Sequence, residues 1–353
     1  MEQHQTLGSK SLKILKRTIP VAIAALSALS ISAHASSGKL PLALIKSTPL
    51  PAITGGDFDH FAVDLEHNRL YVSAEVYGSI EVFNLKSGAH LLSAKNIVKS
   101  PHKLIYIPDK NELFVADADD ASCKVLDATD LHLIKRIPLP PAPDSGVYDP
   151  KSRIFYVGSS GHGAKSSVSS ISLISVDNQT VVSRIPMQAD TLKTMVIDPT
   201  ANRLYVNMRD KKQIGVLDLT SRSVVQVWSA PGLNLNSAMV LDAEQHRLFI
   251  GSRKPGKLFV LDSTSGRLIT TLDIVDTSDD MTFDAPHHRL YISGSNGVDV
   301  VSQDDSNRYQ SVQHVDTFGG KTSVYVPSLH RFYVVHTKGD QAPEAGLQIF
   351  NVN

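Results

Sequence analysis

Polar residues recur at regular intervals along the chain, each time just before a short apolar run. They are Asp59-His60, His102-Lys103, Asp144-Ser145, Lys193-Thr194, Ser237-Ala238, Asp279-Asp280 and Lys321-Thr322. Histidine and lysine side chains can hold a carboxylate or a phosphate, whereas aspartates can hold a cation or an amine. If the fold brings these positions together, the mixture of both charges predicts a binding site for a small ligand.

A second set of polar residues follows the next apolar run in several of these intervals. It includes Glu75, Arg209, Arg253 and His336, which we expect on the same face of the protein. Two longer segments at equivalent positions, 159–170 and 338–346, could contact a ligand or a partner. The same composition would also suit a solvated rim that binds nothing, and the sequence leaves both interpretations open.

Internal repeats are the elements that would position these residues. A turn-like stretch followed by aliphatic, aromatic and β-branched residues occurs seven times, for example at 68–72 and 202–206. The aromatic residues of the seven copies are Tyr71, Phe114, Tyr156, Tyr205, Phe249, Tyr291 and Tyr333, separated by 43, 42, 49, 44, 42 and 42 residues. This spacing is the period of a propeller blade. Each interval contains four short runs typical of strands, which predicts an all-β fold: a seven-bladed β-propeller of four-stranded meander blades.

The last repeat contains only three predicted strands. Residues 44–51 match residues 133–140, the predicted outer strand of the second blade, at six of eight positions. We therefore expect the segment 40–58 to close the ring in the last blade and to lead into the first one, because closure protects exposed strand edges. The sequence predicts one domain, 36–353, with blades near 59–99, 100–141, 142–188, 189–231, 232–275, 276–317 and 318–353.

Residues 1–35 have the pattern of a secretory signal peptide. Basic residues between positions 10 and 17 precede an uncharged apolar run, and Ala33-His34-Ala35 offers small residues to a signal peptidase. The apolar run is shorter than the roughly 20 residues of a membrane-spanning helix. We expect export by the general secretory route, cleavage after Ala35 and no membrane span in the mature chain. The single cysteine, Cys123, excludes an internal disulfide.

The repeats resemble those of a known family. Tyr71-Val72-Ser73, Tyr156-Val157-Gly158 and Tyr205-Val206-Asn207, with Val216-Leu217-Asp218 and Val260-Leu261-Asp262, are similar to the YVTN-repeat β-propellers, which include the YncE-like exported bacterial proteins. The resemblance spans essentially all of the mature chain and implies a propeller fold and a periplasmic location. It implies no particular activity, because propellers carry many unrelated functions.

The balanced net charge and the absence of common enzyme motifs make several classes of function less probable for this chain. The chain has 35 Lys and Arg residues against 35 Asp and Glu residues, which argues against a basic groove for nucleic acid. It lacks the G-x-S-x-G, H-E-x-x-H, Walker and G-x-G-x-x-G motifs of common enzyme and cofactor sites. We therefore expect a monomeric, non-catalytic periplasmic protein without a cofactor or resident metal. Its partner would be a small molecule or a periplasmic protein, bound at the mouth of the propeller channel.

The alternative is a metal-assisted lactonase or related hydrolase, since other propellers carry such chemistry around a divalent cation on the ring axis. The candidates for its ligands and base are Asp59, Asp144, Asp279 and Asp280. A transition metal could also be approached by His60, His102 and His336, although the sequence does not fix their distances. No tryptophan recurs from blade to blade, which argues against a quinone cofactor.

Overall fold

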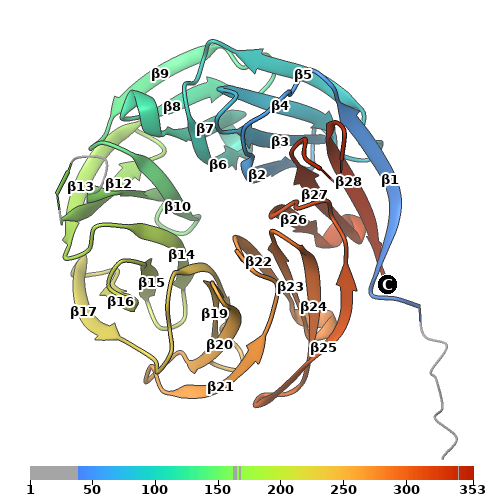
Figure 1. Cartoon of the computed structure of the whole chain (residues 1–353). Coiled ribbons are helices and arrows are strands. Elements are labelled where there is room, and N and C mark those ends of the chain that lie inside the picture. Colours follow the sequence, from blue (N-terminus) through green and yellow to red (C-terminus); the bar gives the residue numbers. More distant parts are fainter. Residues whose placement is uncertain (1–38, 162–164, 167, 341) are drawn as a thin grey trace, which may run out of the picture. The chain divides into compact units, whose positions relative to one another are not determined.

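The computed structural model describes residues 39–161, 165–166, 168–340 and 342–353. The predicted signal peptide, 1–35, lies outside the described residues, as do positions 162–164, 167 and 341 of the two long loops. The described chain from residue 39 onward forms seven four-stranded antiparallel sheets arranged around one axis (Figure 1). The predicted all-β, seven-bladed propeller is therefore confirmed.

The first four blades each take four consecutive strands, from the innermost to the outermost. Blade 1 contains β2 (Asp59–Asp64), β3 (Arg69–Ala74), β4 (Ser79–Asn84) and β5 (His90–Lys95). Blade 2 contains β6 (Pro101–Ile107), β7 (Glu112–Asp117), β8 (Ser122–Asp127) and β9 (Leu133–Pro138). Blade 3 contains β10 (Pro143–Asp149), β11 (Ile154–Ser159), β12 (Ser169–Ser175) and β13 (Thr180–Met187). Blade 4 contains β14 (Leu192–Asp198), β15 (Arg203–Met208), β16 (Gln213–Asp218) and β17 (Ser223–Trp228).

Blades 5 and 6 continue the pattern, whereas blade 7 takes three consecutive strands and β1; short 3-10 turns join some strands. Blade 5 contains β18 (Asn236–Asp242), β19 (Arg247–Arg253), β20 (Gly256–Asp262) and β21 (Leu268–Asp273). Blade 6 contains β22 (Asp280–Asp284), β23 (Arg289–Gly294), β24 (Gly297–Asp305) and β25 (Arg308–Val315). Blade 7 contains β26 (Thr322–Val326), β27 (Arg331–His336), β28 (Ala345–Val352) and β1 (Leu42–Leu50). The turns are η1 (Pro108–Lys110), η2 (Ala118–Asp120), η4 (Ala285–His287) and η5 (Pro327–Leu329).

The N-terminal strand closes the ring as predicted. β1 pairs antiparallel with β28 from Leu42 opposite Val352 to Leu50 opposite Ala345, with a bulge between Leu44 and Lys46. In Figure 1 the blue strand β1 lies along the outer edge of the red blade 7. The ladder gives β28 a partner on both sides, so this edge is not open to another chain.

A tight turn joins the first and second strands of every blade. One residue of each turn has a left-handed backbone, with φ between 49° and 58°: Asn68, Asn111, Arg153, Asn202, His246, His288 and His330. Asparagine and histidine tolerate this conformation better than most residues, which explains why they recur before the second strand. In several blades an aspartate at the end of the first strand caps the turn; Asp198 Oδ1, for example, accepts the backbone N–H of Ala201 at 2.8 Å.

Aromatic residues of the second strands bind neighbouring blades to each other. The hydroxyl of Tyr71 in blade 1 donates to the carbonyl of Ala128 in blade 2 at 2.8 Å, and that of Tyr205 in blade 4 donates to Ser263 in blade 5 at 2.7 Å. Across the closure, Tyr333 of blade 7 donates to Leu85 of blade 1 at 2.6 Å.

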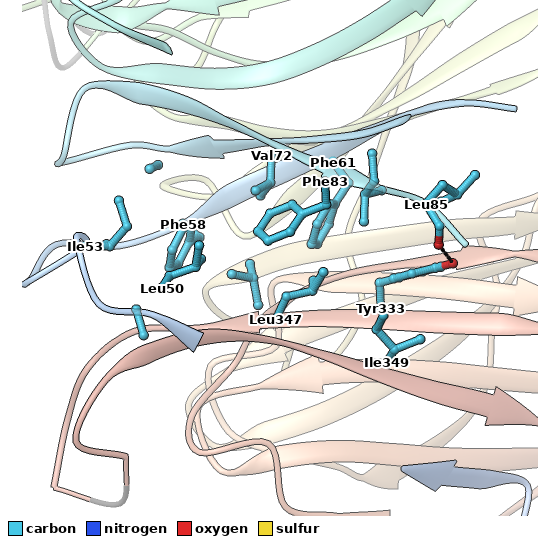
Figure 2. Close-up of a cluster of buried hydrophobic side chains, with 14 of the residues drawn as sticks. Leu50, Ile53, Phe58, Phe61, Val72, Phe83, Leu85, Tyr333, Leu347 and Ile349 are labelled. Carbon is cyan, nitrogen blue, oxygen red and sulfur yellow. Dashed lines mark hydrogen bonds between the residues drawn. The ribbon is translucent and has the colours of Figure 1, made fainter. Parts of the chain in front are cut away.

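Apolar side chains fill the space around the closing bond. Figure 2 shows Tyr333 and Leu347 of blade 7 on one side, with Phe61 and Phe83 of blade 1 on the other, and the bond to Leu85 drawn as a dashed line. The seam between the last and the first blade is therefore packed like a domain interior, although its two sides come from opposite ends of the chain.

Removing the closing hydroxyl should weaken the ring. Tyr333→Phe leaves the buried Leu85 carbonyl without this donor, and we expect the free energy of unfolding to fall by about 1–3 kcal/mol, measured by urea denaturation followed by circular dichroism. Tyr156→Phe is the matched control, because Tyr156 occupies the same place in blade 3 but makes no such bond to the next blade within the described residues. An equal loss in both variants would contradict the assignment.

Candidate functional site

The innermost strands all run in the same direction along the channel, so the residues at their starts meet at one mouth. There the structure forms a cavity of about 200 Å³, which we call the mouth cavity. All seven blades contribute to it. Its lining includes Asp59, His60, Glu75, His102, Asp144, Lys193, Arg253, Asp279 and Lys321 of the residues proposed from sequence, together with Phe58, Ser145, Thr194 and Ser237.

Blades 1 to 4 contribute one run of ionic contacts along the mouth. The His102 Nδ1–H donates to Asp59 Oδ2 at 2.7 Å and lies 3.8 Å from Asp144 Oδ1. The other nitrogen, Nε2, lies 3.7 Å from Glu75 Oε1. Asp144 also forms an ion pair with Lys193. Four side chains from four successive blades are thus linked in order, each acid beside a base.

A second run of contacts continues around the other blades. Lys321 Nζ lies 2.5 Å from Asp57 Oδ2 and 3.1 Å from Asp279 Oδ2. The Ser237 hydroxyl donates to Asp279 Oδ1 at 3.2 Å and accepts from Arg209 Nη2 at 2.6 Å. Side chains of blades 5, 6 and 7 are therefore connected back to the segment that enters blade 1.

His60 joins two acids from distant parts of the sequence. Its Nε2 lies 3.4 Å from Asp59 Oδ1, and its Nδ1 lies 3.2 Å from Asp280 Oδ1 in blade 6. The second oxygen of Asp280 accepts the backbone N–H of Ser323 in blade 7 at 2.9 Å. The position of His60 is thus fixed from blades 1, 6 and 7, which makes the mouth a pre-formed arrangement.

Burial and the ionic contacts shift the pKa values of the mouth residues in opposite directions. Burial lowers the pKa of His102, but its hydrogen bond with Asp59 and the charges of Asp59, Asp144 and Glu75 outweigh it and raise the pKa to about 9. Burial raises the pKa of Asp59, but His60 and His102 hold it well below its usual range. The pKa of His60 is raised because the charges of Asp59 and Asp280 outweigh its burial. The favoured state has anionic Asp59 beside cationic imidazoles.

The same balance holds in the second run. Burial opposes ionisation of Asp279, yet Lys321 and Arg253 lower the pKa of this carboxyl. Burial also opposes the charge on Lys321, but Asp279 and Asp57 raise the pKa of its amine. Arg253 Nη2 lies 3.7 Å from Asp279 Oδ2. Charges of both signs are therefore held in place at the mouth by one another.

Four of the residues proposed from sequence do not line the mouth cavity. Arg209 and Asp280 support it through Ser237 and His60. Lys103 lines a second cavity further along the channel. His336 is buried, lies against Phe318 with ring centroids 5.3 Å apart, and lines a separate pocket beside β1.

The position of His336 corrects two expectations from the sequence. It does not join His60 and His102 in the mouth cavity, so these three histidines do not form one metal site there. The physical reason lies in β27, whose last residue faces Phe318 and donates its Nδ1–H to the carbonyl of Thr337 at 3.2 Å. The repeat alignment gave the blade and the face of His336, but not the direction of its side chain.

One group in the mouth has the donor atoms of a metal site. Single ligand atoms of Asp59, His102 and Asp144 lie within 4.8 Å of one another. Carboxylate oxygen and imidazole nitrogen suit divalent first-row metals. All three residues already have partners: His102 donates to Asp59, and Lys193 pairs with Asp144. A metal would have to displace the His102 proton and compete with Lys193.

Sequence reasoning missed Asp57. It lies in the segment between β1 and β2, outside the repeated strand pattern, so alignment of the blades did not single it out. Its ion pair with Lys321 ties this segment to blade 7 at the mouth. The signal available in the sequence was its distance of two residues from Asp59, at the start of the first innermost strand.

Comparison with known proteins shows the fold and nothing narrower. No protein-family model matches the chain, and no curated protein is similar to it. Among 1707 similar chains of solved structures, one comes from the crystal structure of the mitotic checkpoint complex, with a TM-score of 0.72 and 11% identity over 97% of this chain and 99% of that one. Another belongs to hydrazine synthase of Kuenenia stuttgartiensis, with a TM-score of 0.67 and 17% identity over 84% of this chain and 96% of that one. Likeness to proteins of such different kinds cannot decide the function.

Among the described residues, no helix is long and apolar enough to span a bilayer.

The protonation of His102 provides a direct test of the mouth electrostatics. With a folded pKa of about 9 against an ordinary 6.5, its contribution to stability is complete below about pH 6.5 and disappears as the pH rises through 9. We expect its imidazole NMR signals to titrate near pH 9 in the wild type. In Asp59→Asn the midpoint should fall by more than one pH unit, because the hydrogen-bonded anion is lost. Unchanged titration of His102 would contradict the pairing.

Proposed function

We propose that this chain is an exported, non-catalytic propeller that binds a small ligand carrying charge of both signs at the mouth of its channel. One observation carries the proposal: all seven blades place side chains around a single cavity of about 200 Å³, with carboxylates and cations alternating around it. Convergent polar groups in a concave site are the usual mark of a ligand site.

The cavity suits a small ligand. Its volume is many times that needed by one ordered water, yet below the range of about 300–1,000 Å³ typical of drug-sized ligands. Because the acids and bases are already paired, an ammonium group of a ligand would exchange with a lysine, and a carboxylate with an aspartate. Such an exchange keeps every buried charge compensated, whereas a neutral apolar ligand would leave charges unpaired.

The location and family are part of the same proposal. The basic N-terminal segment, the apolar run and Ala33-His34-Ala35 support export to the periplasm, and the repeated Tyr-Val motifs support membership of the YVTN-repeat, YncE-like propellers. In the other form of this proposal, the mouth binds a partner protein in place of a small ligand. One of the similar folds comes from a protein assembly, the mitotic checkpoint complex.

Ligand binding can be tested with a thermal-shift panel of small amino acids, dicarboxylic acids and sugar phosphates. We expect at least one amino acid to raise the melting temperature of the wild type, and Ala substitution of His60, His102, Lys193 or Asp280 to abolish that shift. Lys86→Ala, on the exposed turn between β4 and β5, is the matched surface control and should keep it. A shift that survives in all four mouth variants would refute the site.

A metal-assisted hydrolase is the second candidate, and the Asp59, His102 and Asp144 group favours it. A divalent ion held there would polarise a carbonyl, with Asp279 or Asp280 available as base.

Metal content separates the two candidates. If the hydrolase proposal holds, protein dialysed against Zn²⁺ or Mn²⁺ should retain one ion per chain by mass spectrometry of metals. Asp144→Asn should lose the ion, while Asp130→Asn, in an exposed acidic group on another part of the surface, should keep it. No retained ion in the wild type, or equal retention in Asp144→Asn, would exclude this candidate.

A further inference from the structure

A second, larger cavity lies further along the channel than the mouth. This lower chamber measures about 390 Å³ and is lined by the innermost strands of blades 1 to 4. Its lining residues come later in each strand than those of the mouth, so the chamber lies on the side of the opposite face. His60, Ser145 and Thr194 line both cavities and separate the two.

The chamber contains a lysine without a partner. Lys193 and Lys321 pair with aspartates at the mouth, whereas Lys103 makes no hydrogen bond or ion pair with any residue in the described part of the chain. The charges of Asp280 and Asp59 act on its amine, but both carboxylates already have histidine partners. Burial lowers the pKa of Lys103, so its amine would gain from an anion beside it.

A buried hydroxyl at the boundary also lacks a partner. Ser145 is 2% exposed, and its Oγ has no hydrogen-bond partner among the described residues. Buried polar atoms in native proteins are almost always paired, so an unpaired one needs an explanation. This hydroxyl has no accessible surface and faces Gly158 of β11, so a molecule in the chamber would pair with Lys103 and not with Ser145.

Most of the other residues along the chamber wall have apolar side chains, although polar and apolar atoms share its exposed surface about equally. They are Ala62, Val63, Leu104, Ile105, Val147 and Met195, with the rings of Tyr106 and Tyr148. The Tyr106 hydroxyl donates to Asn111 Oδ1 at 3.3 Å in the turn after β6, so its polar end is engaged away from the lysine. A ligand body in this space would contact aliphatic and aromatic carbon.

We propose that the lower chamber is a second binding site, for an organic monoanion with an apolar body. The anionic group is held by Lys103, and the aliphatic or aromatic body lies against the wall between Ile105 and Met195. This proposal goes beyond the mouth site and does not depend on it, because the two cavities use different lysines.

Calorimetric titration of the full chain with acetate, hexanoate, benzoate and hexylamine tests the proposal. We expect hexanoate and benzoate to bind one per chain, with hexanoate at least tenfold tighter than acetate, since each buried methylene contributes about fourfold in affinity. Lys103→Met, which keeps the stem and removes the charge, should weaken both by about tenfold or more. Ser145→Ala, which removes a hydroxyl that faces Gly158 and not the chamber, should bind like the wild type. Lys151→Met, an exposed lysine on a turn, is the matched control and should bind like the wild type.

Each other result overturns the proposal. Absence of hexanoate and benzoate binding in the wild type, or equal affinity in Lys103→Met, removes the role of the lysine. Hexylamine binding as tightly as hexanoate removes the charge preference, and acetate binding as tightly as hexanoate removes the apolar body. Loss of binding in Lys193→Met with retention in Lys103→Met places the anion at the mouth instead. If Lys103→Met does not fold by circular dichroism, the comparison of the four ligands decides.

Discussion

Each blade of this chain depends on its neighbours, because a four-stranded sheet with apolar side chains on both faces cannot remain in water by itself. The sheets solve this by packing face to face around an axis, and the solution is complete only when the last blade meets the first. Tyr71, Tyr205 and Tyr333 repeat the same hydrogen bond from one blade to the next, including across the closure. Ring closure therefore fixes the positions of the innermost strands, and with them the channel.

The channel follows from that geometry. Starts of seven strands from distant parts of the sequence meet at one mouth, where side chains are partly withdrawn from water. Charges in such a place must be compensated by charges of the other sign, and His102 between Asp59 and Asp144 shows how closely this is done. Lys103, further along the channel, is an exception to this compensation, because its amine has no ion pair among the described residues.

The fold could be predicted from the sequence because the same strand pattern occurs in seven repeats, and each repeat strengthens the prediction. The aromatic residue at 71 and its six equivalents gave the number of blades, and the match between residues 44–51 and 133–140 gave the closing strand. Alignment also placed Asp59, His102, Asp144, Lys193, Asp279 and Lys321 at one mouth. It could not give depth or side-chain direction, so Lys103 lies in the lower chamber and His336 points to Phe318. Asp57 was missed because it belongs to no repeat.

Pairing of β1 with β28 has a consequence for the order of events during synthesis. The side chain of Asn353 donates a hydrogen bond to the carbonyl of Leu40, 313 positions earlier in the sequence. β1 therefore cannot pair until β28 has been synthesised. Until β28 is in place, β1 has no partner in blade 7 and the ring of blades cannot close. Completion of the fold is thus a late, long-range step, and it separates the time of translation from the time at which the channel exists.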